Sequence, residues 1–198
     1  MNMFEKAYVF SLAMKGDTMN VLKQATIFAK EAHGDQKRKY SGEPYIVHPV
    51  AVSKIVIDAL RREKTDEKLI EQVAAAAVMH DVLEDTLVTK EEMQDKFGEF
   101  ITNLVLQVTD VSQPEDGNRE IRKGIDRDHI ANGTYLGKTI KLADLIDNTR
   151  DIVANDRDFA KTYVREKILL LEVLKDGNPY LYRTAKNLAY DAKIDLDI

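Results

Sequence analysis

The sequence predicts an all-α protein folded as a single helical domain, and three observations support this. Only 9 glycines and 4 prolines interrupt its 198 residues. No segment shows the strict apolar–polar alternation that is typical of β-strands, whereas apolar residues recur at helical spacing between Val21 and Ala32. A chain of this length can bury one good core but not two large ones. We therefore expect one domain over residues 17–198, preceded by an N-terminal extension or short helix over residues 1–16.

Composition limits the classes of function. Hydrophobic residues make up 44% and charged residues 32%, which is typical of a soluble globular protein and argues against extensive disorder. The net charge of −5 argues against general nucleic-acid binding, although a local basic cluster could still bind a small polyanion. No apolar run reaches the length of a membrane span, and residues 1–15 lack the charged-then-apolar order of a secretion signal. Cysteine is absent, which fits a reducing compartment, so we expect a cytoplasmic protein.

Capping and turn residues predict where the first helices begin. A short helix over residues 3–14 is followed by a helix that Asp17 or Thr18 would cap. After a polar loop, Pro49 suits the first turn of a further helix and leaves His48 at its N-cap.

The rest of the chain is also punctuated into helices. Thr65 would cap a helix that continues without a break to Asp85. Thr89 and Glu92 have the spacing of a capping box, and the helix that they begin would end at Gly98. Further helices are expected over residues 100–109, 118–131, 137–151, 168–174 and 181–192.

The most informative stretch is a histidine followed closely by three acids. On one continuous helix, His80 and Glu84 would be neighbours at i,i+4, as would Asp81 and Asp85. Acids this close repel one another and raise one another's pKa unless a cation neutralises them. The apolar run over residues 73–79 indicates that the helix is buried, and buried charges need partners. The simplest explanation is a divalent metal site, and the alternative is a solvated helix end with ordinary surface acids.

Two basic stretches are candidates for phosphate binding. Arg38 and Lys39 lie in the polar loop, and Arg119, Arg122 and Lys123 share one side of an expected helix. Each set could equally be a solvated charged surface.

An acidic and amide face is expected on a helix farther along the chain. Asp144, Asn148 and Asp151 share this face, although the surrounding sequence is apolar. An aspartate inside an apolar helix is costly unless it is paired or bound to a metal.

Together these stretches resemble the hydrolase domain of the RelA/SpoT alarmone enzymes, which belongs to the HD-domain metal phosphohydrolases. The motifs that carry the resemblance are PYIVHP at residues 44–49, HDVLEDT at residues 80–86, and KLAD at residues 141–144 followed by Asn148. The resemblance covers about residues 21–156 and includes the stand-alone small alarmone hydrolases and the metazoan SpoT homologue. It implies an HD-domain helical bundle without the synthetase and regulatory domains of the long enzymes.

The resemblance also implies a metal and its ligands. His48, His80, Asp81 and Asp144 would bind the metal, which is Mn²⁺ in this family. A mixture of imidazole and carboxylate ligands suits such a metal.

The remaining site residues follow from the same comparison. Glu84 and Asp85 match the acidic pair that orients and deprotonates the attacking water, and the spacing leaves open which of them is the base. Substrate contacts are expected from Arg38, Lys39, Asn148, Lys141, Arg119 and Arg122.

The implied reaction is Mn²⁺-dependent hydrolysis of the 3′-pyrophosphate of alarmone nucleotides, which converts (p)ppGpp or (p)ppApp to GDP/GTP or ADP/ATP. Tyr40 and the segment over residues 118–131 depart from the better-known members, so the choice between guanine and adenine stays open. The alternative is an HD phosphohydrolase that acts on another nucleotide phosphoester, either a nucleoside monophosphate or the NADPH 2′-phosphate. A non-enzymatic nucleotide sensor would be expected to have lost ligands, and none is missing. The expected partner is a small nucleotide, with no nucleic acid and no membrane, and a homo-oligomer stays open.

Overall fold

The structure is a computed structural model, and it describes residues 20–198. Within this range the chain forms helices and no β-strand, so the all-α prediction is confirmed. Lys37 and Pro44 form one isolated bridge within the polar loop. The helix expected over residues 3–14 lies outside the described residues. The cap expected at Asp17 or Thr18 is wrong, because the helix Val21–His33 is capped by Asn20, whose side chain accepts the N–H of Lys23. No helix over residues 20–198 combines the length and apolar character needed to span a membrane.

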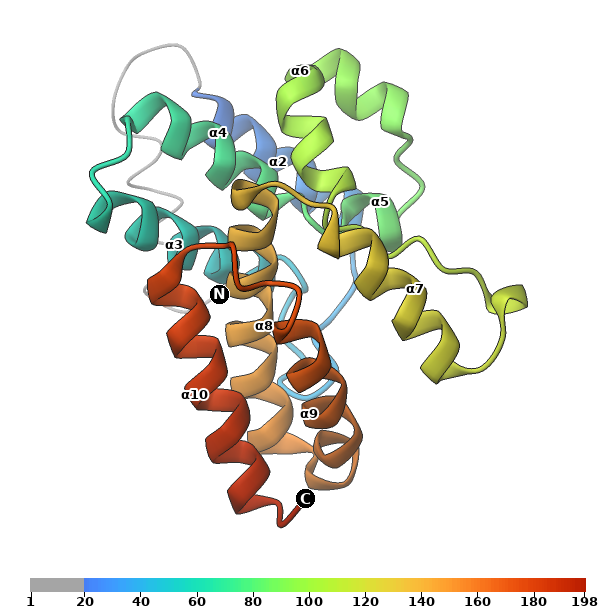
Figure 1. Cartoon of the computed structure of the whole chain (residues 1–198). Helices are drawn as coiled ribbons and strands as arrows, with labels where there is room; N and C mark the ends of the chain where they lie inside the picture. The colour runs from blue at the N-terminus through green and yellow to red at the C-terminus, as the bar shows by residue number, and fades with distance from the viewer. Residues whose placement is uncertain (1–19) are drawn as a thin grey trace.

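The first half of the fold is arranged around one buried helix. Its elements are α2 (Val21–His33), α3 (Val47–Arg62), α4 (Glu67–Val78), the short α5 (Val82–Asp85) and α6 (Lys90–Leu106). Helix α4 packs against α2, α3 and α6, which lie together in the upper part of Figure 1. The alanine-rich C-terminal part of α4 is fully buried, so it anchors everything that follows it at a fixed depth.

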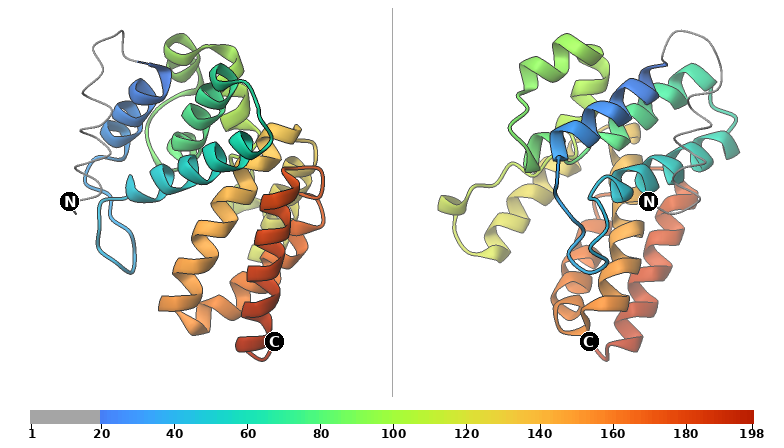
Figure 2. Two further views of the ribbon diagram at one scale, coloured as in Figure 1. Left: turned by 90° about the vertical axis from the view of Figure 1, so that its left-hand side faces the viewer. Right: turned by 180° about the vertical axis from the view of Figure 1, so that it is seen from behind.

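The second half is built on a long helix that reaches both parts of the molecule. Helix α8 (Tyr135–Asn155) packs beside α9 (Arg157–Leu171) and α10 (Pro179–Asp195) in the lower part of Figures 1 and 2, and it also packs against α3. Helix α7 (Arg119–Ala131) follows the 3₁₀ turn η1 (Pro114–Asp116) and projects from the side of the molecule (Figure 1).

Capping residues explain several boundaries. The capping box of Thr89 and Glu92 is confirmed, since each side chain accepts the backbone N–H of the other residue. The predicted stop at Gly98 is a kink inside α6, where φ is 80°, a value that favours glycine. Asp66, and not Thr65, caps α4 by accepting two backbone N–H groups of its first turn. Helix α3 begins at Val47, so His48 lies in its first turn and not at its N-cap.

The C-terminal helices are longer than predicted. Asp156 caps α9 by accepting the N–H of Phe159, so this helix begins well before the expected start at Ile168. Asn178 caps α10 in the same way, and this helix starts at Pro179. Apolar periodicity does not reveal these starts, because the first turn of α9 begins with two charged residues and because both caps are polar residues outside the apolar pattern.

Candidate metal centre and adjoining pocket

His80 and the three acids do not lie on one continuous helix, so the predicted i,i+4 face is wrong. Helix α4 ends at Val78, and His80 and Asp81 form a turn before α5. The physical cause is a local competition. His80 Nδ1 lies 2.9 Å from the carbonyl oxygen of Ala77, which is the acceptor that residue 81 would use in a continuing helix. The break directs His80 into the interior and separates it from the acids of α5.

The structure nevertheless brings the four predicted metal ligands together from three elements. His80 Nε2 lies 3.0 Å from Asp81 Oδ1 and 3.6 Å from Asp144 Oδ1. His48 Nε2, from α3, lies 3.3 Å from Asp144 Oδ1 and 3.7 Å from Asp81 Oδ2. The ligand atoms of His48, His80 and Asp81 all lie within 4.8 Å of one another, a spacing that one metal ion could bridge.

The donors at this centre fit a divalent cation. Because a carbonyl oxygen can only accept, His80 Nδ1 carries the proton that faces Ala77, and Nε2 offers a lone pair to the centre. This buried Nε2 has no hydrogen-bond partner among residues 20–198. Burial disfavours a charged His80, yet Asp81 and Asp144 raise its pKa to about 10, so the site attracts positive charge. Two imidazole nitrogens and two carboxylates are suitable ligands for a divalent metal ion that would supply this charge.

Two residues that the sequence left without a role hold these ligands in place. Asp147 Oδ2 lies 2.6 Å from His48 Nδ1 and accepts its proton, which leaves Nε2 free for a metal. The Tyr45 hydroxyl donates to Asp81 Oδ2 over 2.5 Å. Asp147 lies three residues after Asp144, and this i,i+3 spacing on α8 was the signal that could have revealed it.

Lys141 links the metal centre to the space beside it. Its Nζ lies 3.2 Å from Asp144 Oδ2 and 3.4 Å from the carbonyl oxygen of Val108. Burial alone would lower the pKa of Lys141, but the negative charges of Asp144, Asp110 and Glu84 raise it above its usual value. Lys141 therefore stays protonated and keeps a positive charge at the edge of the centre.

The acidic pair on α5 has a different environment from the buried ligands. The side chains of Glu84 and Asp85 reach the surface. The protein around Glu84 still displaces enough water from its carboxyl group to raise its pKa to about 7, against the opposing charge of Lys141. Loss of water and repulsion from Asp81 also raise the pKa of Asp85. A carboxyl group that titrates near neutral pH can both take and return a proton.

The basic loop is joined to α8 through Arg38. Its guanidinium donates to Asp151 Oδ2 at 2.8 Å and to Asn148 Oδ1 at 3.3 Å, and it lies 3.6 Å from Asp147. Asn148 in turn donates to Asp144 Oδ1 over 2.6 Å. The predicted substrate residues Arg38 and Asn148 therefore lie beside the metal ligands and form one polar chain with them.

Lys39, the next residue of the basic loop, lies at the surface of the protein. Its side chain is 70% exposed, and its Nζ lies 3.1 Å from Asp156 and 5.7 Å from the ring centroid of Phe159. The Tyr40 hydroxyl donates to the same carboxylate over 2.9 Å. The loop is thus attached to the start of α9 as well as to α8.

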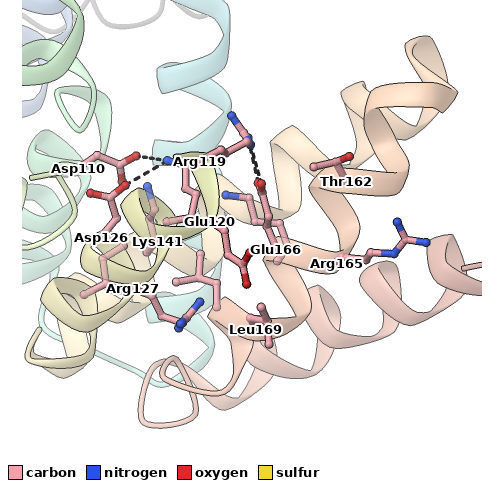
Figure 3. A pocket seen from close by; sticks show the side chains of 14 residues that line it. Asp110, Arg119, Glu120, Asp126, Arg127, Lys141, Thr162, Arg165, Glu166 and Leu169 are labelled. Carbon is pink, nitrogen blue, oxygen red and sulfur yellow. Dashed lines mark hydrogen bonds and ion pairs between the residues drawn. The ribbon is translucent and has the colours of Figure 1, made fainter. Parts of the chain in front are cut away.

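A pocket of about 490 Å³ lies between α7, α8 and α9, and Lys141 belongs to both the pocket and the metal centre (Figure 3). This volume is in the range of small-molecule sites. The lining carries more cations than carboxylates. The charged residues are Asp110, Arg119, Glu120, Lys123, Asp126, Arg127, Lys141, Arg165, Glu166 and Lys167.

The two predicted arginines of α7 differ in position. Arg119 lines the pocket, and it makes two hydrogen bonds to the carboxylate of Glu166, at 2.6 and 2.9 Å. Lys123 also lines it and pairs with Asp110. Arg122 does not line this pocket, although it neighbours Arg119 and Asp126 on α7, and its Nε is buried without a hydrogen-bond partner among residues 20–198.

Comparisons with known proteins identify relatives of this chain. Residues 25–170 match the model of the family described as HD domain. The guanosine-3′,5′-bis(diphosphate) 3′-pyrophosphohydrolase MESH1 of Danio rerio is 36% identical over 133 residues, which are 67% of this chain and 69% of the relative. The bifunctional (p)ppGpp synthase/hydrolase SpoT of Escherichia coli is 42% identical over 89 residues, which are 45% of this chain and 11% of that enzyme.

The fold is similar to a solved structure as well. The structure of a metazoan orthologue of SpoT that hydrolyses ppGpp superposes with a TM-score of 0.74 at 28% identity. The match covers 89% of this chain and 98% of that one.

Proposed function

The chain belongs to the HD-domain family and, within it, to the MESH1-type guanosine-3′,5′-bis(diphosphate) 3′-pyrophosphohydrolases, and on this premise we propose that it is a Mn²⁺-dependent 3′-pyrophosphohydrolase of alarmone nucleotides. One observation carries the proposal. His48, His80, Asp81 and Asp144 converge, and Lys141 connects them to a cation-rich pocket. Glu84 is near enough for the charges of Asp81 and Lys141 to act on its pKa. A metal phosphohydrolase of a polyanionic nucleotide needs such a combination.

The four residues His48, His80, Asp81 and Asp144 would hold the metal. When bound, it supplies Lewis-acid activation of water and stabilises negative charge on phosphoryl oxygens. Asp147 and Tyr45 keep His48 and Asp81 oriented toward it through their hydrogen bonds.

Residues of this chain accept the proton of the attacking water and neutralise the negative charge that develops during the reaction. Glu84 takes a proton from the attacking water, a role for which its raised pKa suits it, and Asp85 is the second candidate for this role. The water oxygen forms a bond to the phosphorus that is attached to the ribose 3′-oxygen, and the bond from that phosphorus to the 3′-oxygen breaks. The protonated Glu84 then returns its proton to the 3′-oxygen that leaves. Lys141 and Arg38 place positive charge beside the group that leaves. The products are pyrophosphate and a nucleoside 5′-di- or triphosphate.

Substrate choice within the class is part of the proposal. The relatives' names specify the guanine nucleotide, and adenine alarmones are the other candidates because of the changes at Tyr40 and in α7. A cytoplasmic location and a homo-oligomeric state stay predictions.

Product analysis by ion-exchange chromatography tests the proposal. Metal-stripped protein is given ppGpp, ppApp, NADPH or a nucleoside monophosphate, with and without Mn²⁺. We expect Mn²⁺-dependent release of pyrophosphate from ppGpp or ppApp, and the faster of the two defines the base preference. Faster release of inorganic phosphate from NADPH or nucleoside monophosphates would instead assign the alternative class of HD phosphohydrolase.

A further inference from the structure

Lys167 is a cation of the pocket that the proposed mechanism does not use. It comes from α9 and lines the pocket. The other lysines of the pocket and Arg119 are already paired with carboxylates. Among residues 20–198, no carboxylate lies within ion-pair distance of Lys167. Arg127 and Arg165 also line the pocket, and in Figure 3 the Arg165 guanidinium points away from the other labelled side chains.

The surroundings of Lys167 make an anionic ligand favourable. Its Nζ lies 5.0 Å from the ring centroid of Tyr163, which is itself buried. Burial, together with the positive charge of Lys141, lowers the pKa of Lys167 to about 8. An isolated ammonium group with a lysine nearby and no carboxylate partner is stabilised when an anion enters the pocket.

The position of Lys141 defines which part of the substrate can reach this cation. Lys141 contacts Asp144, a proposed metal ligand, and also lines the pocket, so the pocket adjoins the metal centre. A nucleotide whose 3′-pyrophosphate lies at the metal centre extends its ribose past Lys141. The other charged end of such a nucleotide is its 5′-phosphate group.

We propose that Lys167 binds the 5′-phosphates of the substrate and thereby selects nucleotides that are phosphorylated at both ends of the ribose. This inference rests on the proposed function, because that function places the 3′-pyrophosphate at the metal. It assigns Lys167 a role in substrate affinity and no role in bond cleavage.

Steady-state kinetics with two substrates test this assignment. Wild type and Lys167→Met are compared on ppGpp and on guanosine 3′-diphosphate, which lacks the 5′-phosphates. A charge-assisted hydrogen bond predicts that KM for ppGpp rises about 10- to 100-fold, while kcat and the KM for guanosine 3′-diphosphate change little. Lys167→Arg, which keeps the charge, should recover most of the affinity for ppGpp.

A matched control separates this contact from general loss of positive charge. Lys161 lies on the same helix with an exposed side chain and does not line the pocket, so Lys161→Met should behave like wild type on both substrates. An equal rise of KM on both substrates in Lys167→Met, or the same rise in Lys161→Met, would overturn the inference.

Binding of GDP to the Mn²⁺-loaded protein gives a readout without turnover. Calorimetry should show weaker GDP binding to Lys167→Met than to wild type, and guanosine should not distinguish the two. If wild type hydrolyses no alarmone, the proposed function fails, and the GDP result still reports whether Lys167 contacts the 5′-phosphates. Equal GDP affinity of the two proteins would contradict the contact itself.

Discussion

The metal centre and the adjoining pocket share Lys141 but are built in opposite ways. At the centre, His48 and His80 are 2% and 1% exposed, and a carboxylate or a carbonyl group orients each ring. In the pocket, the Arg119 side chain is 47% exposed and pairs with a carboxylate from another helix. Buried polar groups with specific partners are costly to move, whereas exposed ion pairs contribute little to stability. The comparison indicates that the core of the fold fixes the catalytic geometry and that the pocket is adjusted around it.

The largest expected effect is the loss of a buried ligand. Asp81→Ala removes one metal donor and leaves the Tyr45 hydroxyl without its acceptor. We expect the protein to retain no Mn²⁺ after desalting and to release pyrophosphate at least about a thousandfold more slowly, because metal stabilisation is worth several kcal/mol. Elemental analysis and a turnover assay measure both quantities. Asp58→Ala, at an exposed position of α3, is the control, and retention of Mn²⁺ by Asp81→Ala would contradict the assigned ligand set.

A smaller effect is expected at Glu84, an acid that is not a proposed metal ligand. Glu84→Gln keeps the size of the side chain and removes its ability to accept a proton. We expect unchanged Mn²⁺ content and a kcat lower by about 10²- to 10³-fold, as is usual for loss of a general base. Asp85→Asn is measured in parallel, since the variant with the larger loss identifies the base. If both variants keep the wild-type kcat, neither acid handles the proton.

These two predictions depend on features that differ in how far the sequence revealed them. The grouping of His48, His80, Asp81 and Asp144 could be predicted because they belong to short motifs that resemble a known family, and because an aspartate inside the apolar α8 needs a partner. The end of α4 at Val78 could not be predicted from the sequence, because it depends on the hydrogen bond from the His80 ring to the carbonyl oxygen of Ala77. The pocket was still harder to predict from the sequence. Arg119 and Glu166 are 47 residues apart, and the sequence alone does not show that α7 and α9 face each other.

The third prediction concerns a residue that orients a ligand. Asp147→Ala removes the carboxylate that accepts the proton of His48 Nδ1. Loss of such an outer contact typically weakens metal binding about 10- to 100-fold. A Mn²⁺ titration should show this weaker affinity, and excess Mn²⁺ should restore most of the activity. Asp147→Asn retains an acceptor for this hydrogen bond and should fall between wild type and Asp147→Ala; an unchanged affinity in Asp147→Ala would show that His48 does not depend on this contact.

The smallest effect on stability is expected in the pocket. Arg119→Met breaks the ion pair with Glu166, which is worth at most about 1 kcal/mol at a position so exposed. Chemical denaturation should therefore show nearly unchanged stability, while the KM for the alarmone rises. A large loss of stability would mean that the pocket is as tightly fixed as the metal centre, and the contrast between the two regions would be wrong.

The most direct test of the central claim is a titration of Mn²⁺ into metal-free protein while pyrophosphate release from ppGpp or ppApp is followed. The single cluster of ligands among residues 20–198 predicts no release without metal and full activity when one Mn²⁺ is bound per chain. Release of pyrophosphate at the same rate without any divalent metal would contradict the claim, as would a fully loaded, folded protein that releases none.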